Sequence, residues 1–571
     1  MRIWLTLLSG LVLIGAQAPS YDLLITHGLI YDGSGGAPFA GEVAIRGQRI
    51  IYVGPHAPLR EAVRTIDAHG LAVAPGFINM LAHPEESLMA DNSALSDLAQ
   101  GVTLEVVGED SMAPLTPEMA RLMQARQGDI RFPVTWTTLD GYFREMQHRR
   151  MSVNLASFVG AGTVRADVLG EGDVQPNPEQ LAAMRGLVRQ AMEDGALGVT
   201  TALIYSPNDY ARTPELIALA QESAKCGGLY IAHIRSEGDR LMEAVDETLD
   251  IARASGAPAE IYHFKQSGQD NWSKLDPVVA RIEAARASGT RITADMYVYT
   301  AGATGLDAAM PPWVQSGGLE AWIARLKDPA IRARVAAEMR ERPKDWENLY
   351  WAAGPDRTLL LAFKNDKLKP LTGKTLAEAA RLRGESPEDT AIDLVIEDGS
   401  RVGVAYFLMS EDNIRREVAL PWMSFGSDEA APAPQGVFLK SNPHPRAYGN
   451  FAKVFATYVR KDHALSVQEA VRKLSALPAD TLSLKNRGHL ASGDFADLVI
   501  FDPATIQDHA TYAQPHQLAT GVVDVLVNGQ LAFEDGKPTS ARPGEVVRGR
   551  AWTGAPGGGC RSSAGEWSWA S

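Results

Sequence analysis

The sequence predicts an α/β protein built as a (β/α)8 barrel, with a small β-sandwich domain formed by both terminal segments. Two short apolar runs, Ile231–His233 and Ile261–His263, each end in a histidine. The intervening Glu237–Gly256 has the apolar period of a helix, which gives a strand, helix, strand unit with parallel strands. Further apolar strands alternate with amphipathic helices between two β-patterned ends, as expected for a parallel barrel carrying a second domain.

The central segment contains the strands that such a barrel requires. Each candidate is a short apolar run, and eight of them would close the ring. The eight candidates are Phe77–Leu81, Thr103–Val107, Val153–Phe158, Gly198–Leu203, Leu229–His233, Glu260–Phe264, Ile292–Tyr297 and Met423–Phe425. A ninth run, Gly403–Met409, is also strand-like.

Alternation of apolar and polar residues marks both ends of the chain as β-structure. It covers Tyr21 to Val73, and returns in Ala496–Phe501 and Val522–Val527. We therefore assign residues 19–73 plus 485–548 to the β-sandwich and 74–484 to the barrel. A mainly helical pattern over about 310–411 predicts an insertion that forms a lid or wall over the site. Residues 549–571 lack periodicity and are expected to be disordered.

The N-terminus predicts export. Arg2 precedes an apolar run that ends at Ile14, and Ala16-Gln17-Ala18 follows, which is the order of a signal peptide over residues 1–18. The run is short for a membrane span, so we expect a periplasmic or secreted protein without a stable span after cleavage. An uncleaved anchor is the alternative. Cys226 and Cys560 could pair, but we treat both as structural or incidental. The net charge of −14 argues against a nucleic-acid partner.

His233 and His263 are expected at the same edge of the sheet, because parallel barrel strands carry their chemistry at their carboxyl ends. Two imidazoles that converge there, with carboxylates available elsewhere, favour a metal site over two unrelated core histidines.

Several motifs resemble the amidohydrolase superfamily and, within it, the D-aminoacylase (N-acyl-D-amino-acid deacylase) family. The resemblance covers roughly Tyr21 to Val547 and rests on a combination of short motifs. They are Val73–Ile78, the two strand-end histidines, Ala232–Glu237, Tyr262–Lys265, Asp295–Thr300, Gly426–Asp428 and His444–Gly449.

Two departures from that family affect the metal ligands. The usual His-x-His after the first barrel strand is Leu81-Ala82-His83, and leucine cannot bind a metal. His83 is therefore expected to line the pocket or support a ligand. Where the family offers a cysteine, this chain has Gly108-Glu109-Asp110, and a carboxylate can replace a thiolate on zinc. We favour Glu109 as the ligand, and Asp110 is the alternative.

The resemblance extends to the residues around the metal. Asp428 is expected to act as general acid and base, and the alternative is a purely structural role as a helix N-cap. Lys265 matches a group that meets the substrate carboxylate or polarises the carbonyl, and a solvated surface lysine is the alternative. Tyr297 and Arg446 are further substrate-binding candidates. Arg446 suits bidentate capture of a carboxylate, and a structural ion pair is equally compatible with its position.

Together these residues predict a metal-dependent hydrolase of a non-peptide carbon–nitrogen bond. One divalent metal ion held by Glu109, His233 and His263 is expected to activate a water; Zn²⁺ is favoured, and other divalent metals are the alternative. Asp428 transfers the proton, and a small-molecule amide is cleaved. The resemblance implies an N-acyl-D-amino acid as substrate. A D-dipeptide, a cyclic amide, or a non-catalytic metal- or ligand-binding descendant of the fold are the alternatives, and Leu81 is the main support for the last.

Overall fold

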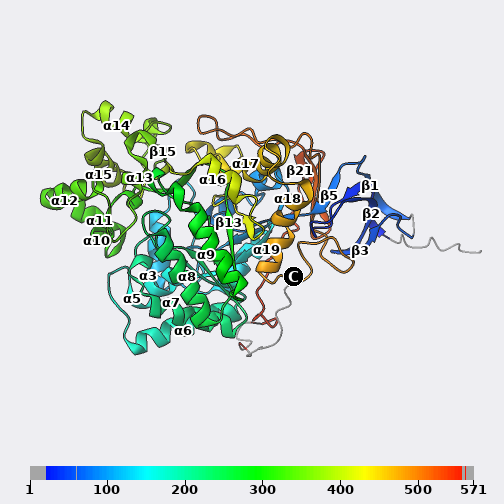
Figure 1. The fold of residues 1–571 in the computed structure, drawn as a ribbon, viewed down its shortest axis with the longest axis horizontal. Coiled ribbons are helices and arrows are strands. Elements are labelled where there is room, and N and C mark those ends of the chain that lie inside the picture. The colour runs from blue at the N-terminus through cyan, green and yellow to red at the C-terminus, as the bar shows by residue number, and fades with distance from the viewer. Residues whose placement is uncertain (1–20, 59–60, 556–559, 561–571) are drawn as a thin grey trace, which may run out of the picture.

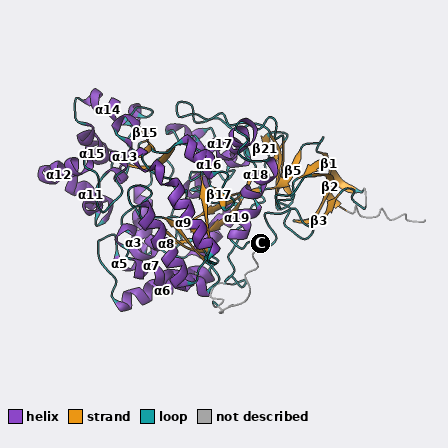
Figure 2. Cartoon of the chain, viewed as in Figure 1, coloured by secondary structure: helices purple, strands orange, loops and turns teal. Residues whose placement is uncertain are grey.

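The structure is a computed structural model that describes residues 21–58, 61–555 and 560 (Figure 1). The predicted signal peptide, residues 1–18, lies outside the described residues, as does most of the tail that was expected to be disordered. Three regions are visible: a β-rich part that holds β1, β2 and β3, a central helix-covered barrel, and a helical part around α10–α15 (Figures 1 and 2).

The predicted eight-stranded barrel is confirmed in the described part of the chain. Six parallel strands follow the order β17-β13-β12-β11-β10-β9, and three more follow β6-β7-β8. β8 and β9 are successive parts of one extended segment, residues 154–160. The Met80 N–H donates to the Phe425 carbonyl at 3.2 Å and joins β6 to β17. The strands are β6 (Phe77–Asn79), β7 (Val102–Val107), β8 (Asn154–Ser157), β9 (Val159–Gly160), β10 (Gly198–Ala202), β11 (Leu229–His233), β12 (Ala259–Ile261), β13 (Ile292–Met296) and β17 (Met423–Phe425).

The barrel strands are short and buried along their whole length, which explains their continuously apolar sequences. Helices follow the strands and pack against their neighbours in chain order. α8 shows how the sequence sets the helix ends: its apolar face is buried and the chain leaves the helix at Gly256, where φ is +75°. These outer helices are α5 (Ala161–Leu169), α6 (Pro178–Glu193), α7 (Thr213–Lys225), α8 (Leu241–Ser255) and α9 (Leu275–Ala287).

Strands from both ends of the chain pair in one nine-stranded sheet. β5 pairs with β1 in parallel and with β18 antiparallel, so the N-terminal and C-terminal segments meet at this strand. The Ala496 N–H donates to the Gln48 carbonyl at 2.8 Å, which brings the far edge of the sheet back onto the C-terminal segment. The sheet contains β1 (Tyr21–Ile30), β2 (Phe39–Arg46), β3 (Arg49–Gly54), β4 (Ala62–Asp67), β5 (Ala72–Pro75), β18 (Leu498–Phe501), β19 (Val522–Val527), β20 (Gln530–Glu534) and β21 (Lys537–Pro538).

The segment between β13 and β17 combines helices with a small antiparallel sheet. The ninth strand candidate is β16 (Gly403–Phe407), which pairs with β14 (Ala301–Gly305) and β15 (Thr358–Ala362) instead of entering the barrel. The helices are α10 (Pro312–Gln315), α11 (Gly318–Leu326), α12 (Pro329–Met339), α13 (Leu349–Ala353), α14 (Leu376–Arg383) and α15 (Pro387–Asp398). Eight residues of this segment line the cavity at the barrel mouth, namely Tyr297, Gly302, Ala303, Thr304, Leu349, Arg401, Tyr406 and Leu408.

Cys226 and Cys560 form a disulfide. Cys226 directly follows α7, and Cys560 belongs to the tail that was expected to be disordered. The bond therefore ties this point of the tail to the barrel. No helix among the described residues is long and apolar enough to cross a membrane.

Candidate metal centre

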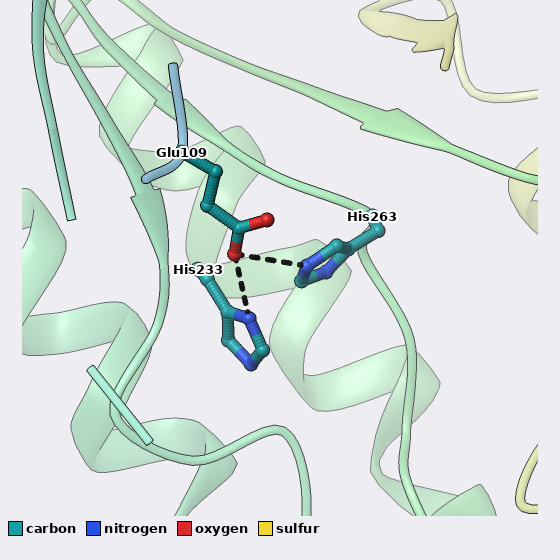
Figure 3. Close-up of side chains that lie close together, drawn as sticks. All are labelled: Glu109, His233 and His263. Atoms are coloured by element: carbon teal, nitrogen blue, oxygen red, sulfur yellow. Dashed lines mark hydrogen bonds and ion pairs between the residues drawn. The ribbon is translucent and has the colours of Figure 1, made fainter. Parts of the chain in front are cut away.

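Glu109, His233 and His263 bring three potential metal ligands together at the carboxyl ends of the barrel strands (Figure 3). Glu109 Oε1 lies 2.9 Å from His233 Nδ1 and 3.8 Å from His263 Nε2. Zinc bonds of about 2.0–2.2 Å in a tetrahedral site place neighbouring ligand atoms about 3.3 Å apart. The two observed distances bracket that value, so the donor atoms fit a single cation.

The backbone conformation at and next to Glu109, His263 and Asp428 places these side chains. Gly108 has φ +114°, and a Cβ atom there would lie 2.6 Å from the Phe158 carbonyl oxygen, so the turn that presents Glu109 requires glycine. His263 and Asp428 have φ values of +34° and +51°. Non-glycine residues rarely adopt this left-handed conformation, and such conformations cluster at functional sites.

A second carboxylate, Asp428, forms an adjoining group with His83 and Glu109. Asp428 Oδ1 lies 3.1 Å from His83 Nε2, and Glu109 Oε2 lies 3.3 Å from the same nitrogen. Leu81 is fully buried and packs with Tyr262 and Phe158 in the barrel core. The position that departs from His-x-His is thus part of the hydrophobic core, whereas His83 reaches the cavity.

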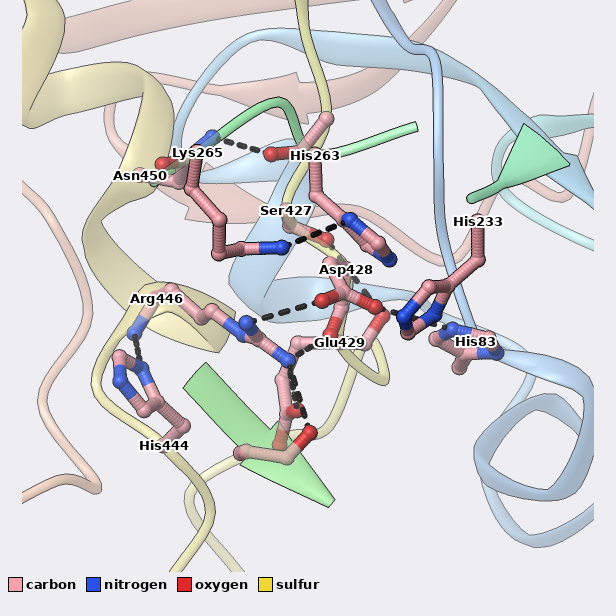
Figure 4. A network of polar contacts seen from close by, with 12 residues as sticks. His83, His233, His263, Lys265, Ser427, Asp428, Glu429, His444, Arg446 and Asn450 are labelled. Atoms are coloured by element: carbon pink, nitrogen blue, oxygen red, sulfur yellow. Dashed lines mark hydrogen bonds and ion pairs between the residues drawn. The ribbon is translucent and has the colours of Figure 1, made fainter. Parts of the chain in front are cut away.

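The charges around Asp428 keep it ionised. Burial raises the pKa of this carboxyl, but the positive charge of Arg446 and the hydrogen bond with His83 outweigh burial, so its pKa is lowered. Arg446 Nη1 lies 2.9 Å from Asp428 Oδ2, and Nη2 also donates to the Asp428 carbonyl (Figure 4). The Arg446 side chain is only 1% exposed. The structure thus contains the ion pair that was the alternative to direct substrate binding by Arg446.

Lys265 is buried next to His263 and is held by Glu237, a residue that carried no assigned role in the sequence analysis. Lys265 Nζ donates to Glu237 Oε1 at 2.5 Å and lies 2.8 Å from His263 Nδ1. Glu237 Oε1 is also 2.8 Å from His263 Nδ1. A carboxylate at Nδ1 favours the tautomer that carries its proton there, so that both Nδ1–H and Lys265 donate to Glu237 and the Nε2 lone pair faces Glu109.

The cavity above these residues has a volume of about 340 Å³. Lys265, Tyr297 and Asp428 line it together with the three ligand candidates, and Arg446 lies behind Asp428. Asp110, the alternative ligand, also lines the cavity but is exposed and is not in the three-ligand group. Glu109, the favoured residue, is the one that faces both histidines.

Two residues of the cavity wall, Tyr205 and Arg401, belong to no motif in the sequence. Tyr205 packs edge-on against His233, with ring centroids 5.3 Å apart. Arg401 comes from the segment between α15 and β16. Only the folding of the chain brings these two side chains to the cavity, so their local sequence does not indicate it. The Ala232–Glu237 motif already contained Glu237, so the motif itself could have indicated this residue.

A closed parallel barrel with potential histidine and carboxylate ligands at the carboxyl ends of its strands is typical of the class of metal-dependent barrel hydrolases. Comparison of the sequence with family models then gives the family. Residues 64–533 match the model of the amidohydrolase family, and the chain belongs to that family.

The chain is also similar to individual members along nearly its whole length. It is 32% identical to an N-acyl-D-glutamate deacylase of Alcaligenes xylosoxydans xylosoxydans over 531 residues, which are 92% of this chain and 96% of that protein. A crystal structure of D-aminoacylase superposes with a TM-score of 0.77 at 30% identity, covering 92% of this chain and 100% of that one. An N-acyl-D-glutamate deacylase from Bordetella bronchiseptica, complexed with zinc and a phosphonate inhibitor, gives 0.75 at 29% identity, with coverage of 92% and 99%.

Proposed function

We propose that this protein is a metal-dependent amidohydrolase that cleaves N-acyl-D-amino acids. The observation that carries the proposal is the convergence of Glu109, His233 and His263 beside Asp428 in one cavity. The relatives named above add the substrate class, since they are named for the deacylation of N-acyl-D-amino acids or as D-aminoacylase.

The residues present fit a divalent metal, and we propose one Zn²⁺ ion held by Glu109, His233 and His263. Nitrogen and carboxylate donors suit zinc, and the Bordetella deacylase was crystallised with zinc. When bound, such an ion supplies an activated water and polarises the amide carbonyl. His83 with Glu109 and Asp428 forms an adjoining group of donors, but Leu81 removes one histidine from that side.

The chain's own residues then move protons and orient the substrate. Asp428 is ionised, so it accepts a proton from the attacking water and returns it to the departing amine nitrogen. Arg446 fixes Asp428 in place through its ion pair. Lys265 and Tyr297 line the cavity beside His263 and offer a cation and a hydroxyl to the substrate carboxylate.

Release of free amine from matched N-acetyl-D- and N-acetyl-L-amino acids tests the proposal. The protein is assayed as prepared, after treatment with a chelator, and after zinc is restored. We expect cleavage of the D-substrates, loss of activity with the chelator, and recovery with zinc. Cleavage that ignores the chelator, or no cleavage of any D-substrate by the zinc-loaded protein, would contradict it.

We also propose that the protein is exported, with residues 1–18 removed as a signal peptide. The order of charge, apolar run and small residues supports this. The Cys226–Cys560 disulfide supports it independently, because disulfides persist in oxidising compartments. N-terminal sequencing of the protein recovered from the periplasm, the medium and the cytoplasm tests the cleavage. A chain outside the cytoplasm that begins directly after Ala18 supports export. A chain that keeps Met1 and stays in the cytoplasm opposes it.

A further inference from the structure

Arg401 places a second cationic side chain on the cavity wall, in addition to Lys265. Its side chain is 47% exposed and lines the cavity. Nε lies 2.8 Å from Asp307 Oδ2, and Nη2 donates to Thr304 Oγ1 at 3.1 Å. These contacts fix the orientation of the guanidinium and use two of its five N–H groups. The other three N–H groups are on a side chain that is about half-exposed and lines the cavity.

The two cations are associated with different ligand histidines. Lys265 adjoins His263 directly, with Nζ 2.8 Å from Nδ1. Arg401 is on the His233 side, because its Cζ lies 4.9 Å from the centre of the Tyr205 ring, which packs against His233. A substrate whose amide lies at the ligand cluster therefore has a cationic side chain on the side of each ligand histidine.

The acidic neighbours of Arg401 offset part of its charge but do not use its remaining N–H donors. Asp307 is only 7% exposed and holds the arginine from the protein side. Asp110 lies on the same wall but is exposed, where water screens it. The arginine therefore remains the donor on this wall that suits a planar anion, since its fork matches a carboxylate in a bidentate arrangement.

We propose that Arg401 binds a second carboxylate of the substrate, carried by the amino-acid side chain or by the far end of the acyl group. The inference rests on the proposed function, in which Lys265 receives the α-carboxylate. The preferred substrates are thus dicarboxylates, and Arg401 is the residue that selects them.

Two matched substrate pairs distinguish the two sources of the carboxylate. N-acetyl-D-glutamate against N-acetyl-D-glutamine tests the side chain, and N-succinyl-D-leucine against its terminal amide tests the acyl group. We expect the acid to exceed its neutral partner in kcat/KM by about tenfold or more in at least one pair, chiefly through KM. In Arg401→Met, that ratio falls toward one.

Further variants separate binding from folding. Arg401→Met/Asp307→Asn avoids leaving the buried Asp307 charge unpaired, and Arg401→Lys retains the charge and part of the preference. Arg381→Met removes an exposed arginine of the same segment that does not line the cavity, and keeps the wild-type ratio. Calorimetric binding of each substrate pair to Asp428→Asn, with and without Arg401→Met, gives a readout that does not need turnover.

The outcomes for Arg401 and for the overall function differ. If the zinc-loaded protein cleaves neutral N-acyl-D-amino acids as well as it cleaves the acids, and Arg401→Met changes neither the ratio nor binding, the proposal for Arg401 is wrong while the deacylase function stands. If no N-acyl-D-amino acid is cleaved, the proposed function fails. Loss of the binding preference in Arg401→Met would still support an anion site.

Discussion

His233 Nδ1 and Glu109 Oε1 lie 2.9 Å apart although they are separated by 124 positions in the chain. Glu109 follows β7 and His233 ends β11, so the barrel alone brings them together. His263 approaches the same carboxylate oxygen at 3.8 Å from a third strand. Residues at the carboxyl ends of three strands thus each contribute one donor atom to a common point.

Glu109 and Asp110 are adjacent carboxylates with different expected roles. Glu109→Gln removes the oxygen that faces both histidines, and we expect metal affinity to fall by more than about 100-fold, since even loss of a residue that only orients a ligand costs 10–100-fold. Asp110→Asn is the matched control, because Asp110 is exposed and should leave metal binding close to wild type. Titration with zinc measures both, and a reversed order would assign the ligand to Asp110.

Asp428 is expected to transfer protons without being needed to hold the metal. Asp428→Asn keeps the size of the side chain and removes its basicity, so kcat should fall by about 10²- to 10⁴-fold. Zinc content measured on the same sample should stay at the wild-type level. Near-normal turnover in Asp428→Asn would show that another group carries the proton.

Glu237 and Lys265 form a buried ion pair beside His263, with both side chains 7% exposed. Removing one partner leaves a buried charge unpaired, so Glu237→Gln and Lys265→Met should each lower the free energy of unfolding by about 3–5 kcal/mol. The double variant should lose less than the sum of the two. Denaturant unfolding of all four proteins measures this coupling, and strictly additive losses would mean that the pair is not coupled.

Glu222 on α7 provides a pH-dependent contribution to stability away from the site. Burial raises its pKa, but Lys225, Arg189 and Arg185 outweigh burial and lower it to about 2. A lowered pKa means that the stabilisation is complete above the unfolded value, about 4.3, and is lost as the pH falls toward 2. Glu222→Gln should remove this part of the acid sensitivity in thermal unfolding between pH 5 and 3. An unchanged pH dependence would contradict the assignment.

The sequence was sufficient to predict the barrel because its strands are short apolar runs separated by helices. Each of the eight predicted runs contains or overlaps an observed barrel strand, and β11 and β17 have the predicted bounds. Gly403–Met409 had the same local pattern, and only its antiparallel partners show that it belongs to another sheet. Local sequence does not specify which strands pair, so this ninth run could not be assigned from its own residues.

The chemistry was predictable where a motif carried it and was missed where tertiary structure supplied it. His233 ends a strand and His263 follows one, and this pattern indicates their shared position at one edge of the sheet. Arg401 lies between a helix and a strand of the insertion, and nothing in its neighbourhood indicates that it reaches the cavity. The cysteines are 334 positions apart, so their pairing also depends on the fold alone.

The central claim is that two imidazoles and one carboxylate hold a catalytic metal, and elemental analysis of the purified protein tests it most directly. We expect about one equivalent of zinc in the wild-type protein and a large loss in a His233→Ala/His263→Ala variant that remains folded, with amidase activity following the metal. A wild-type protein that contains no metal, binds none when zinc is added, and responds to no divalent ion would contradict the account.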